Sequence, residues 1–341
     1  GTGLFAALVL ITGALAAPDA EAQPADEVNI YSARHYPTDD QLYRGFEAAT
    51  GIRVNRLEGS SDALIERIKR EGDNSPADIL LTVDAGRLWR AEQADLFQPT
   101  QSPVLEERIP AHLRHPDGLW FGFSTRARMI FVSKGSDLAG KVTRYEDLAD
   151  PGLGETVCVR SSGNIYNLSL LASIIAHKGA EAARRWADGV VANFARRPQG
   201  GDTDQIRAVA AGACSVAVAN SYYYVRLRAS DDPDDRQAAG AVRPIFPNQD
   251  GRGTHVNVSG AGVVATAPHP RAARRFLEYL ASDEAQAIFA RGNNEYPAAE
   301  AAPVAPALDA LGAFKADQLN VSALGRYQAD AQRIFDRAGW P

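Results

Sequence analysis

The sequence predicts an α/β protein built from two lobes, and three observations lead to this fold class. At 341 residues, the chain exceeds the usual size of one domain, so two domains are expected. Short apolar runs alternate with segments of helical periodicity, as in helices packed on a largely parallel sheet. Extended stretches near residues 125 and 245 interrupt this alternation, and we interpret them as crossings between the lobes.

The first series of elements begins with a strand at residues 27–32 (EVNIYS). A helix is expected from Thr38, with Gln41 as its capping-box partner, and Gly51 is typical of a helix end. The remaining elements of this series are a strand at 52–57, a helix from 61, a strand at 77–83 and a helix from about 86.

The extended stretch 120–133 (WFGFSTRARMIFVS) predicts the first crossing, and a second series follows it. This series comprises a strand at 156–160, helices at 165–178, 180–192 and 203–211, a strand at 214–219, a strand at 256–265, a long helix from 269 to about 291, an Ala/Pro-rich return linker at 297–306 and a last helix to about 338.

We therefore assign residues 27–125 and 245–300 to the first lobe, and residues 126–244 and 301–341 to the second. Each lobe is split along the sequence by the crossings. A cleft between two such lobes is a natural ligand site, and hinge closure around a ligand is the expected motion.

The N-terminus carries an apolar run at residues 4–17 (LFAALVLITGALAA). At about 14 residues it is shorter than the roughly 20 that span a bilayer. Its length suits a secretory signal, and small-x-small cleavage sites follow at 14–16 and 20–22. We expect a signal peptide over residues 1–22 and export; a buried helix is the alternative. No Lys or Arg precedes Arg34, and the first residue is Gly, so we infer that upstream residues were lost.

Composition and charge exclude some classes of partner. The chain is 45% apolar and 23% charged, as in globular proteins, and its net charge is -6. A mildly acidic protein is a poor candidate for binding nucleic-acid phosphates, so no nucleic-acid partner is expected. The two cysteines, Cys158 and Cys214, lie in strand-like runs. An exported pair often closes a disulfide, and two buried small hydrophobic side chains are the alternative.

Five of the 11 tyrosines gather at the carboxyl ends of predicted strands, where open α/β sheets bind ligands. They are Tyr36, which follows His35; Tyr166, at the start of a helix; and Tyr222, Tyr223 and Tyr224, which follow the run CSVAVAN. Core or interface packing is the alternative role for such residues. Three adjacent tyrosines cannot all face one site.

The donor chemistry of this set favours a hard trivalent cation. A phenol has a pKa near 10, and such a cation could hold its anion at neutral pH. Soft metals prefer thiolate or thioether, but the cysteines are predicted to pair and Met129 is the sole methionine. Calcium and magnesium prefer carboxylates and carbonyls, which these loops largely lack. Ferric iron fits best.

Several segments resemble the periplasmic ferric-iron-binding proteins of ABC importers, most closely the FutA-like group that ligates iron with one His and four Tyr. The segments are YSARHYPTD, VRSSGNIYNLSLLASII, GDTDQIRAVAAGACSVAVANSYYY, THVNVSGAG, FLEYLASDEAQ and NNEYP. They cover nearly the whole mature chain, in order. The resemblance implies a two-lobed type II periplasmic-binding fold, with a mostly parallel sheet flanked by helices in each lobe and hinge strands between them.

Residue by residue, the resemblance implies the metal ligands His35, Tyr36, Tyr166, Tyr222 and Tyr223. We expect Tyr224 to pack and Tyr31 to point into the lobe or toward the hinge. No matching role falls to the other histidines, namely His112, His115, His177, His255 and His269. The implied function is a monomeric periplasmic receptor that delivers Fe³⁺ to an ABC permease and its ATPase, without catalysis.

Four phenolates around one ferric ion leave an excess negative charge, which a nearby cation would compensate. Arg34 and Arg160 flank the ligand segments and are the candidates. Two alternatives stay open. The fold could hold an oxyanion, polyamine or small organic solute, with Ser161, Ser162 and helix N-termini as donors. A secreted enzyme is disfavoured, since the sequence has no G-x-S-x-G, HExxH, P-loop or reactive-thiol pattern.

Overall fold

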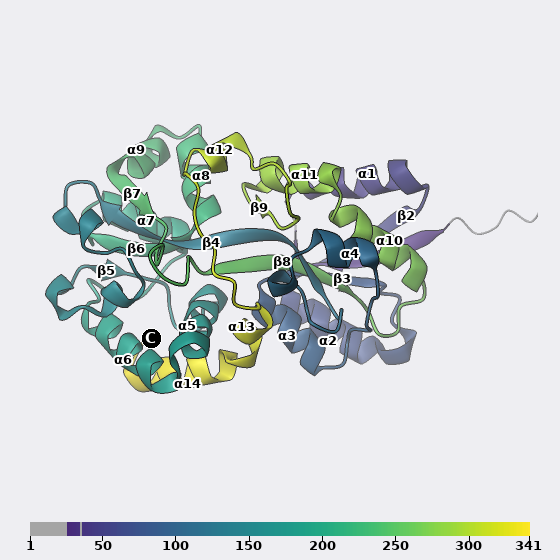
Figure 1. Cartoon of the computed structure of the whole chain (residues 1–341), viewed down its shortest axis with the longest axis horizontal. Coiled ribbons are helices and arrows are strands. Elements are labelled where there is room, and N and C mark those ends of the chain that lie inside the picture. The colour runs from purple at the N-terminus through teal and green to yellow at the C-terminus, as the bar shows by residue number, and fades with distance from the viewer. Residues whose placement is uncertain (1–25, 35) are drawn as a thin grey trace, which may run out of the picture.

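A computed structural model describes residues 26–34 and 36–341, which form two lobes along the long axis of the molecule (Figure 1). The predicted signal peptide, residues 1–22, and the predicted ligand His35 lie outside the described residues. None of the helices among the described residues is long and apolar enough to span a bilayer.

The elements follow the predicted alternation. Before the first crossing they are β1 (Glu27–Ser32), α1 (Asp39–Thr50), β2 (Arg53–Glu58), α2 (Ser61–Glu71), β3 (Ile79–Val83), α3 (Ala85–Gln93) and α4 (Pro103–Arg108). The crossing strand and the next series are β4 (Phe121–Ser133), β5 (Val157–Cys158), α5 (Ile165–Lys178), α6 (Ala180–Ala192), α7 (Asp202–Ala210), β6 (Val216–Asn220), α8 (Ser221–Ala229), α9 (Pro233–Ala241) and β7 (Val242–Ile245).

The chain then returns through a second long strand. The returning elements are β8 (Val256–Val263), α10 (Pro270–Leu280), α11 (Asp283–Asn293), β9 (Tyr296–Pro297), α12 (Pro306–Asp309), α13 (Ser322–Arg326) and α14 (Gln328–Ala338). Short 3-10 turns are η1 (Gly72–Asn74), η2 (Ala111–Leu113), η3 (Asp137–Gly140), η4 (Glu146–Ala149) and η5 (Pro151–Leu153).

One mixed sheet runs through both lobes in the order β2-β1-β3-β8-β4-β6-β5, with β7 and β9 also paired to β4. The α/β fold class is confirmed, but the sheet is mixed: β1 pairs in parallel with β2 and β3, and β5 with β6. The long strand β4 is antiparallel to its neighbours. A strand parallel to β4 would need a crossover connection before it. β8 returns the chain to the first lobe, so it runs beside β4 in the opposite direction.

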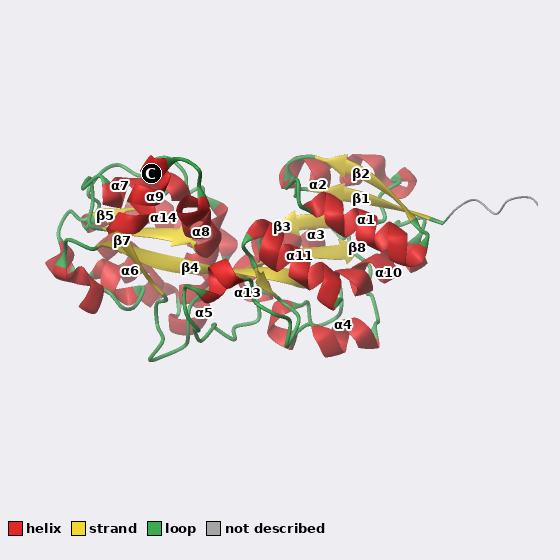
Figure 2. Cartoon of the chain, turned by 90° about the horizontal axis from the view of Figure 1, so that it is seen from above, coloured by secondary structure: helices red, strands yellow, loops and turns green. Residues whose placement is uncertain are grey.

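The strand β4 belongs to both lobes. Residues from Phe121 to Ala127 pair with β8, and residues from Arg128 to Val132 pair with β6. Figure 2 shows strands of each lobe meeting at this place, with helices packed around them. The lobe bounds given above remain our proposal, with β4 and β8 as the strands that join the lobes.

Each lobe has its own apolar core. The first contains Ile30, Leu80 and Phe276, all fully buried. In the second lobe the alternation of β4 divides the core between the two faces of the sheet. Val132 packs with one cluster, and Phe131 packs with another beneath α7 and α8. The sheet of the second lobe is therefore covered on both faces.

Two local predictions fail for identifiable reasons. Thr38 precedes α1, but its hydroxyl lies 2.6 Å from the side-chain oxygen of Asn293 and makes no capping bond. The long helix predicted from 269 to about 291 is two helices, because Ser282 ends the first and caps the second through the amide of Ala285. Ser-Asp-Glu is a helix-start pattern that we missed inside an apolar periodicity.

The predicted disulfide is confirmed. Cys158 and Cys214 are bonded, with their Cα atoms 5.9 Å apart, and no free cysteine remains. Cys158 ends β5, and Cys214 lies just before β6, the parallel neighbour of β5. Both side chains are buried in the core beneath α7.

We expect the Cys158→Ala, Cys214→Ala double variant to lose about 2–4 kcal/mol of unfolding free energy, because the bond closes a long loop in the unfolded chain. Urea denaturation without reductant measures the loss. With reductant, the wild type should approach the stability of the variant. Equal midpoints without reductant would contradict this prediction.

Candidate functional site

Two tyrosines of the second lobe meet at the start of their helices. Tyr166 lies in the first turn of α5, which Asn164 caps by accepting from the amide of Asn167. Tyr222 lies in the first turn of α8, directly after β6. Their hydroxyl oxygens are 3.2 Å apart. Two helices that begin at neighbouring points of the sheet therefore direct two phenols to one place.

The next two tyrosines of α8 face different surroundings. The ring of Tyr223 lies 4.3 Å from that of Tyr222, at an interplanar angle of 32°. The ring of Tyr224 packs on Phe131 in the core, with 5.3 Å between centroids. The predicted packing role of Tyr224 is therefore confirmed. Tyr31 also points away, and its hydroxyl donates to Glu71.

Tyr36 brings the first lobe to this cluster. It lies in the connection between β1 and α1, beside the predicted ligand His35. The guanidinium carbon of Arg226 is 5.3 Å from the ring centroid of Tyr36 and 4.9 Å from that of Tyr222. Tyrosines from both lobes thus contact one exposed cation. Sequence reasoning missed Arg226, although it stands four residues after Tyr222, on the same face of α8.

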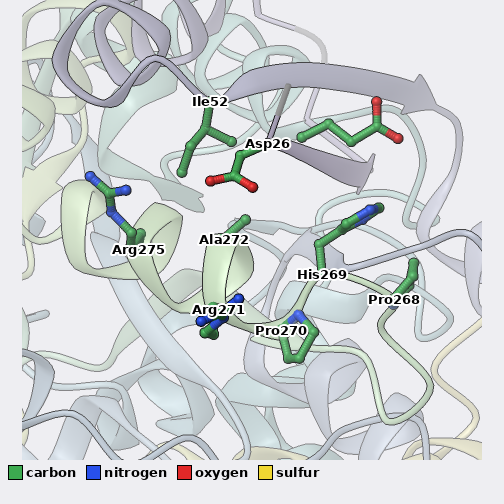
Figure 3. Close-up of a pocket in the computed structure, with 9 residues that line it drawn as sticks. Asp26, Ile52, Pro268, His269, Pro270, Arg271, Ala272 and Arg275 are labelled. Carbon is green, nitrogen blue, oxygen red and sulfur yellow. The ribbon is translucent and has the colours of Figure 1, made fainter. Parts of the chain in front are cut away.

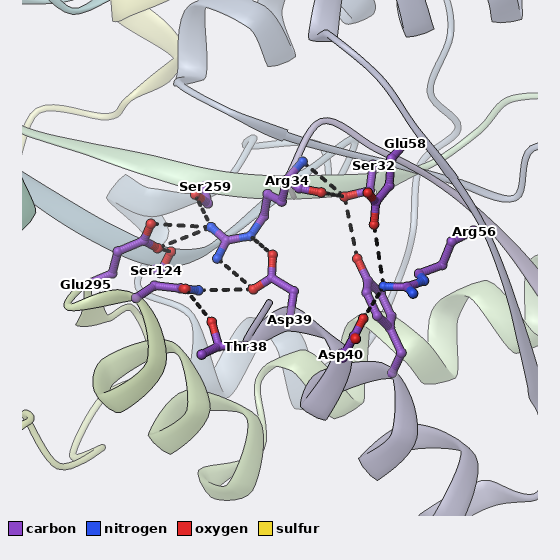
Figure 4. A network of polar contacts seen from close by, with 12 residues as sticks. Ser32, Arg34, Thr38, Asp39, Asp40, Arg56, Glu58, Ser124, Ser259 and Glu295 are labelled. Carbon is purple, nitrogen blue, oxygen red and sulfur yellow. Dashed lines mark hydrogen bonds and ion pairs between the residues drawn. The ribbon is translucent and has the colours of Figure 1, made fainter. Parts of the chain in front are cut away.

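Arg34 is buried behind Tyr36 in a network of ion pairs (Figure 4). Its guanidinium donates to Asp39 at 3.0 Å and lies 3.2 Å from Glu295. Its Nη1 also lies 2.6 Å from the hydroxyl of Ser259, on β8. The ring centroid of Tyr36 is 5.0 Å from the guanidinium carbon. Arg34 thus attaches the loop of Tyr36 to a joining strand.

Glu295 forms a second ion pair with an arginine of the other joining strand. Arg126, on β4, lies 3.0 Å from Glu295 and 5.8 Å from the ring centroid of Tyr222. Burial alone would raise the pKa of Glu295, but the charges of Arg34 and Arg126 outweigh burial and lower it to about 2. Sequence reasoning missed Arg126, although arginine within a buried apolar strand is itself a signal.

A second charged group lies beneath Tyr166. The guanidinium carbons of Arg128 and Arg160 are 5.7 Å and 5.6 Å from its ring centroid. Both arginines contact the buried Asp202, at 2.6 Å and 3.4 Å. Arg160 thus lies against the ring of Tyr166, and its role as a compensating cation stays a prediction.

The described surroundings of the tyrosines carry excess positive charge. The arginines are Arg34, Arg126, Arg128, Arg160 and Arg226, and the carboxylates that pair with them are Asp39, Asp202 and Glu295. Five cations against three anions leave two positive charges. This excess of positive charge stabilises negative charge at the site, whether on a phenolate or on a bound anion.

Without a bound metal cation, the phenols of Tyr222 and Tyr223 keep their protons at neutral pH. Burial raises the pKa of Tyr222 well above 10, and the neighbouring phenols Tyr166 and Tyr223 raise it further against the opposing charge of Arg126. Burial, followed by the charge of Tyr166, raises the pKa of Tyr223 to about 12. Ionisation of several phenols at neutral pH therefore requires a strongly charged partner among them.

Other donor sets do not converge. Among residues 26–34 and 36–341, no group of three or more His, Cys, Asp or Glu side chains is arranged to hold a metal. Three of the other histidines pair with carboxylates: His115 with Glu92, His177 with Asp317 and His269 with Asp78. Within the described part of the chain, tyrosine oxygens are the hard donors that come together.

One cavity lies near the tyrosines, and another lies far from them. One of about 300 Å³ lies between the lobes and is lined by Arg87 and Arg90 from α3 and by Arg160, Ser161 and Asn164 at the start of α5. Another of about 360 Å³ lies at the start of β1 and α10, where Asp26, His269 and Arg275 surround it (Figure 3). None of the predicted site residues lines this second cavity.

A two-lobed α/β fold with polar side chains converging from both lobes is the architecture of a solute-binding protein. A family model for bacterial extracellular solute-binding proteins matches residues 74–316, and the chain belongs to this family.

Particular relatives are similar over almost the whole chain. Iron uptake protein A2 of Synechocystis is 56% identical over 315 residues, covering 92% of this chain and 90% of the relative. Iron uptake protein A1 of the same organism is 51% identical over 314 residues, covering 92% and 87%. A solved Trichodesmium structure (IdiA, FutA), in complex with iron and citrate, is 53% identical with a TM-score of 0.90, covering 92% of this chain and 100% of the other.

We expect the Glu295→Gln variant to lose about 3–5 kcal/mol of unfolding free energy at neutral pH, because two buried guanidiniums lose their shared charge. Urea denaturation measures the loss. Glu278→Gln is the matched control: Glu278 is partly exposed and pairs loosely with Arg274, at 3.7 Å, so we expect a loss below about 1 kcal/mol. Equal losses in the two variants would contradict the assignment.

The ion pairs of Glu295 with Arg34 and Arg126 predict that the protein loses stability in acid. The pKa of Glu295 is lowered from 4.5 to about 2 in the folded protein, so its contribution is fully present above about pH 4.5 and disappears as the pH falls toward 2. The difference in unfolding free energy between wild type and Glu295→Gln should narrow over this range. A difference that stays constant from pH 5 to pH 3 would refute this linkage.

Proposed function

We propose that the protein captures ferric iron between its lobes through His35, Tyr36, Tyr166, Tyr222 and Tyr223. The observation that carries the proposal is the convergence of phenols from three loops: Tyr166 and Tyr222 lie 3.2 Å apart, and Tyr36 shares Arg226 with Tyr222. Relatives named for iron uptake, at up to 56% identity, support it. A ferric ion is the hard, highly charged cation that phenolates prefer.

The arginines around the site would lower the free energy needed to ionise the phenols. Four phenolates and one ferric ion carry one excess negative charge, and the pairs described above leave two positive charges. In this proposal Arg34 and Arg160, the cations expected from the sequence, would act together with Arg126 and Arg226. Each lowers the cost of ionising a phenol when iron displaces its proton.

Iron would also favour the closed arrangement of the lobes. Tyr36 comes from the first lobe, and Tyr166, Tyr222 and Tyr223 come from the second. A cation that binds all of them has its full set of ligands in the closed form alone, so binding shifts the population toward closure.

The biological role that follows is transport. After export by a signal peptide, a monomer in the periplasm would bind Fe³⁺ and deliver it to an ABC permease driven by an ATPase. The chain would perform no catalytic step, in keeping with its family of solute-binding proteins.

One observation favours a second candidate, an oxyanion or small anionic solute. Arg87, Arg90 and Arg160 line the cavity between the lobes at the N-terminal end of α5, which attracts anions. Asp62 also lines it and pairs with Arg90 at 3.0 Å, so the lining has three cations against one anion. The amide of Ser162, one of the donors expected from the sequence, is already bonded to the carbonyl of Pro341 at 2.8 Å. If this candidate is right, replacing Tyr166 and Tyr222 by Phe leaves solute binding nearly intact.

Adding Fe³⁺ to the purified apo-protein should produce a visible tyrosinate-to-iron charge-transfer band. The Tyr222→Phe, Tyr223→Phe variant should lose most of this colour, because two donor oxygens are removed. Tyr224→Phe is the matched control, since its ring packs on Phe131, and the colour should persist. No band in the folded wild type would refute the proposal, and so would equal loss in the control.

Iron affinity should fall steeply as the pH falls. Burial raises the pKa of Tyr222 well above 10 and that of Tyr223 to about 12, so both phenols are protonated at neutral pH and iron must displace their protons. Each proton released makes the affinity change about tenfold per pH unit. Competition with a chelator of known pH dependence measures the slope. An affinity that is constant between about pH 5 and pH 8 would refute the phenolate site.

A further inference from the structure

The loop that leads to Tyr166 begins where its strand ends early. β5 has two residues, and residues 159–164 connect it to α5. Backbone groups beyond the strand cannot pair within the sheet, so they need other partners to hold one conformation. The position of Tyr166, in the first turn of α5, depends on these partners.

Two of the partners come from residues far away in the sequence. The indole Nε1 of Trp340 donates to the carbonyl of Arg160 at 2.9 Å. The carbonyl of Pro341 accepts from the amide of Ser162 at 2.8 Å. From within α5, the side-chain amide of Asn167 also donates to the carbonyl of Arg160, at 3.0 Å. The segment after α14 thus holds both ends of the turn from Arg160 to Ser162.

Trp340 is itself held rigidly. Its side chain is buried, and its ring packs on Phe335, Phe194 and Trp186, with 4.5, 5.0 and 6.1 Å between centroids. An indole fixed by three aromatic rings has one polar atom, and that atom points at the loop. Since the ring cannot turn away without losing this packing, the hydrogen bond to Arg160 has a fixed direction.

We propose that Trp340 is a positioning residue for the iron site. It fixes the conformation of the loop that carries Arg160 and leads to Tyr166. Two distances depend on the loop: the 3.2 Å between the hydroxyls of Tyr166 and Tyr222, and the 5.6 Å between Arg160 and the ring of Tyr166. The inference rests on the proposed function, because it concerns the same ligand. It adds a residue that acts through the backbone of the loop, by its hydrogen bond to the carbonyl of Arg160.

The test compares Trp340→Phe with Trp186→Phe. Both variants lose one indole hydrogen bond and keep an aromatic ring in the same cluster. Phe at position 186 therefore still packs on Trp340 from the side that Trp186 occupies, and the bond from Trp340 to Arg160 is retained in the control. The Nε1 of Trp186 donates to the carbonyl of Tyr145 at 2.7 Å, away from the ligand loop. The two changes should therefore destabilise the fold to a similar extent and differ in their effect on the site.

Two measurements separate positioning from stability. Hydrogen exchange of the apo-proteins should rise in the peptide spanning residues 159–167 in Trp340→Phe, and not in Trp186→Phe. Transfer of iron from the loaded proteins to a chelator should be about five to ten times faster in Trp340→Phe than in wild type, as expected for one lost hydrogen bond. In Trp186→Phe the transfer rate should match the wild type.

Equal exchange and equal iron transfer in the two variants would overturn the proposed role of Trp340. That failure is distinct from failure of the proposed function, in which the wild type itself would form no coloured iron complex. The exchange measurement needs no iron, so it tests the loop in either case. If Trp340→Phe does not fold, Phe194→Leu replaces it, because this change loosens the packing that fixes the indole of Trp340. Exchange at residues 159–167 should then rise, and wild-type exchange there would overturn the proposal.

Discussion

The shared ion pair of Glu295 with Arg34 and Arg126 is the interaction on which the site depends. It is buried, and its members come from the Tyr36 loop, from β4 and from the segment before β9. A buried carboxylate between two guanidiniums is costly to separate, so it fixes the relative position of these segments. The loop of the first lobe is thereby attached to a strand that continues into the second.

This attachment explains how distant tyrosines share one environment. Arg126 faces Tyr222 from β4, and Arg34 faces Tyr36 from the other side of Glu295. Together with Arg226 and the pair beneath Tyr166, they form a positively charged surround before any ligand arrives. Charged groups that are already in place would stabilise phenolates in the proposed iron site without reorganising, which is the electrostatic advantage of a preformed site.

Local patterns predicted most of the fold and the places from which the tyrosines come. The rhythm of strands and helices was predictable because burial and periodicity act over short stretches of chain. The disulfide of Cys158 and Cys214 followed from an even pair of cysteines in a chain expected to be exported. The packing of Tyr224 followed from the family resemblance. The helix break at Ser282 was missed because apolar spacing continued across it. Arg126 was missed because its partner Glu295 lies far away in the sequence. Arg226 is only four residues from Tyr222, but its contact with Tyr36 of the first lobe exists only in the folded chain.

The sequence by itself determined which residues can act: tyrosines at strand ends, few soft donors and a chain long enough for two lobes. The tertiary structure alone decided how they combine. It placed the hydroxyl of Tyr166 beside that of Tyr222 and paired Glu295 with two arginines. It also placed the indole of Trp340 within hydrogen-bond distance of the carbonyl of Arg160. The physical reason is that donor chemistry belongs to single side chains, whereas distance and burial belong to pairs that folding brings together.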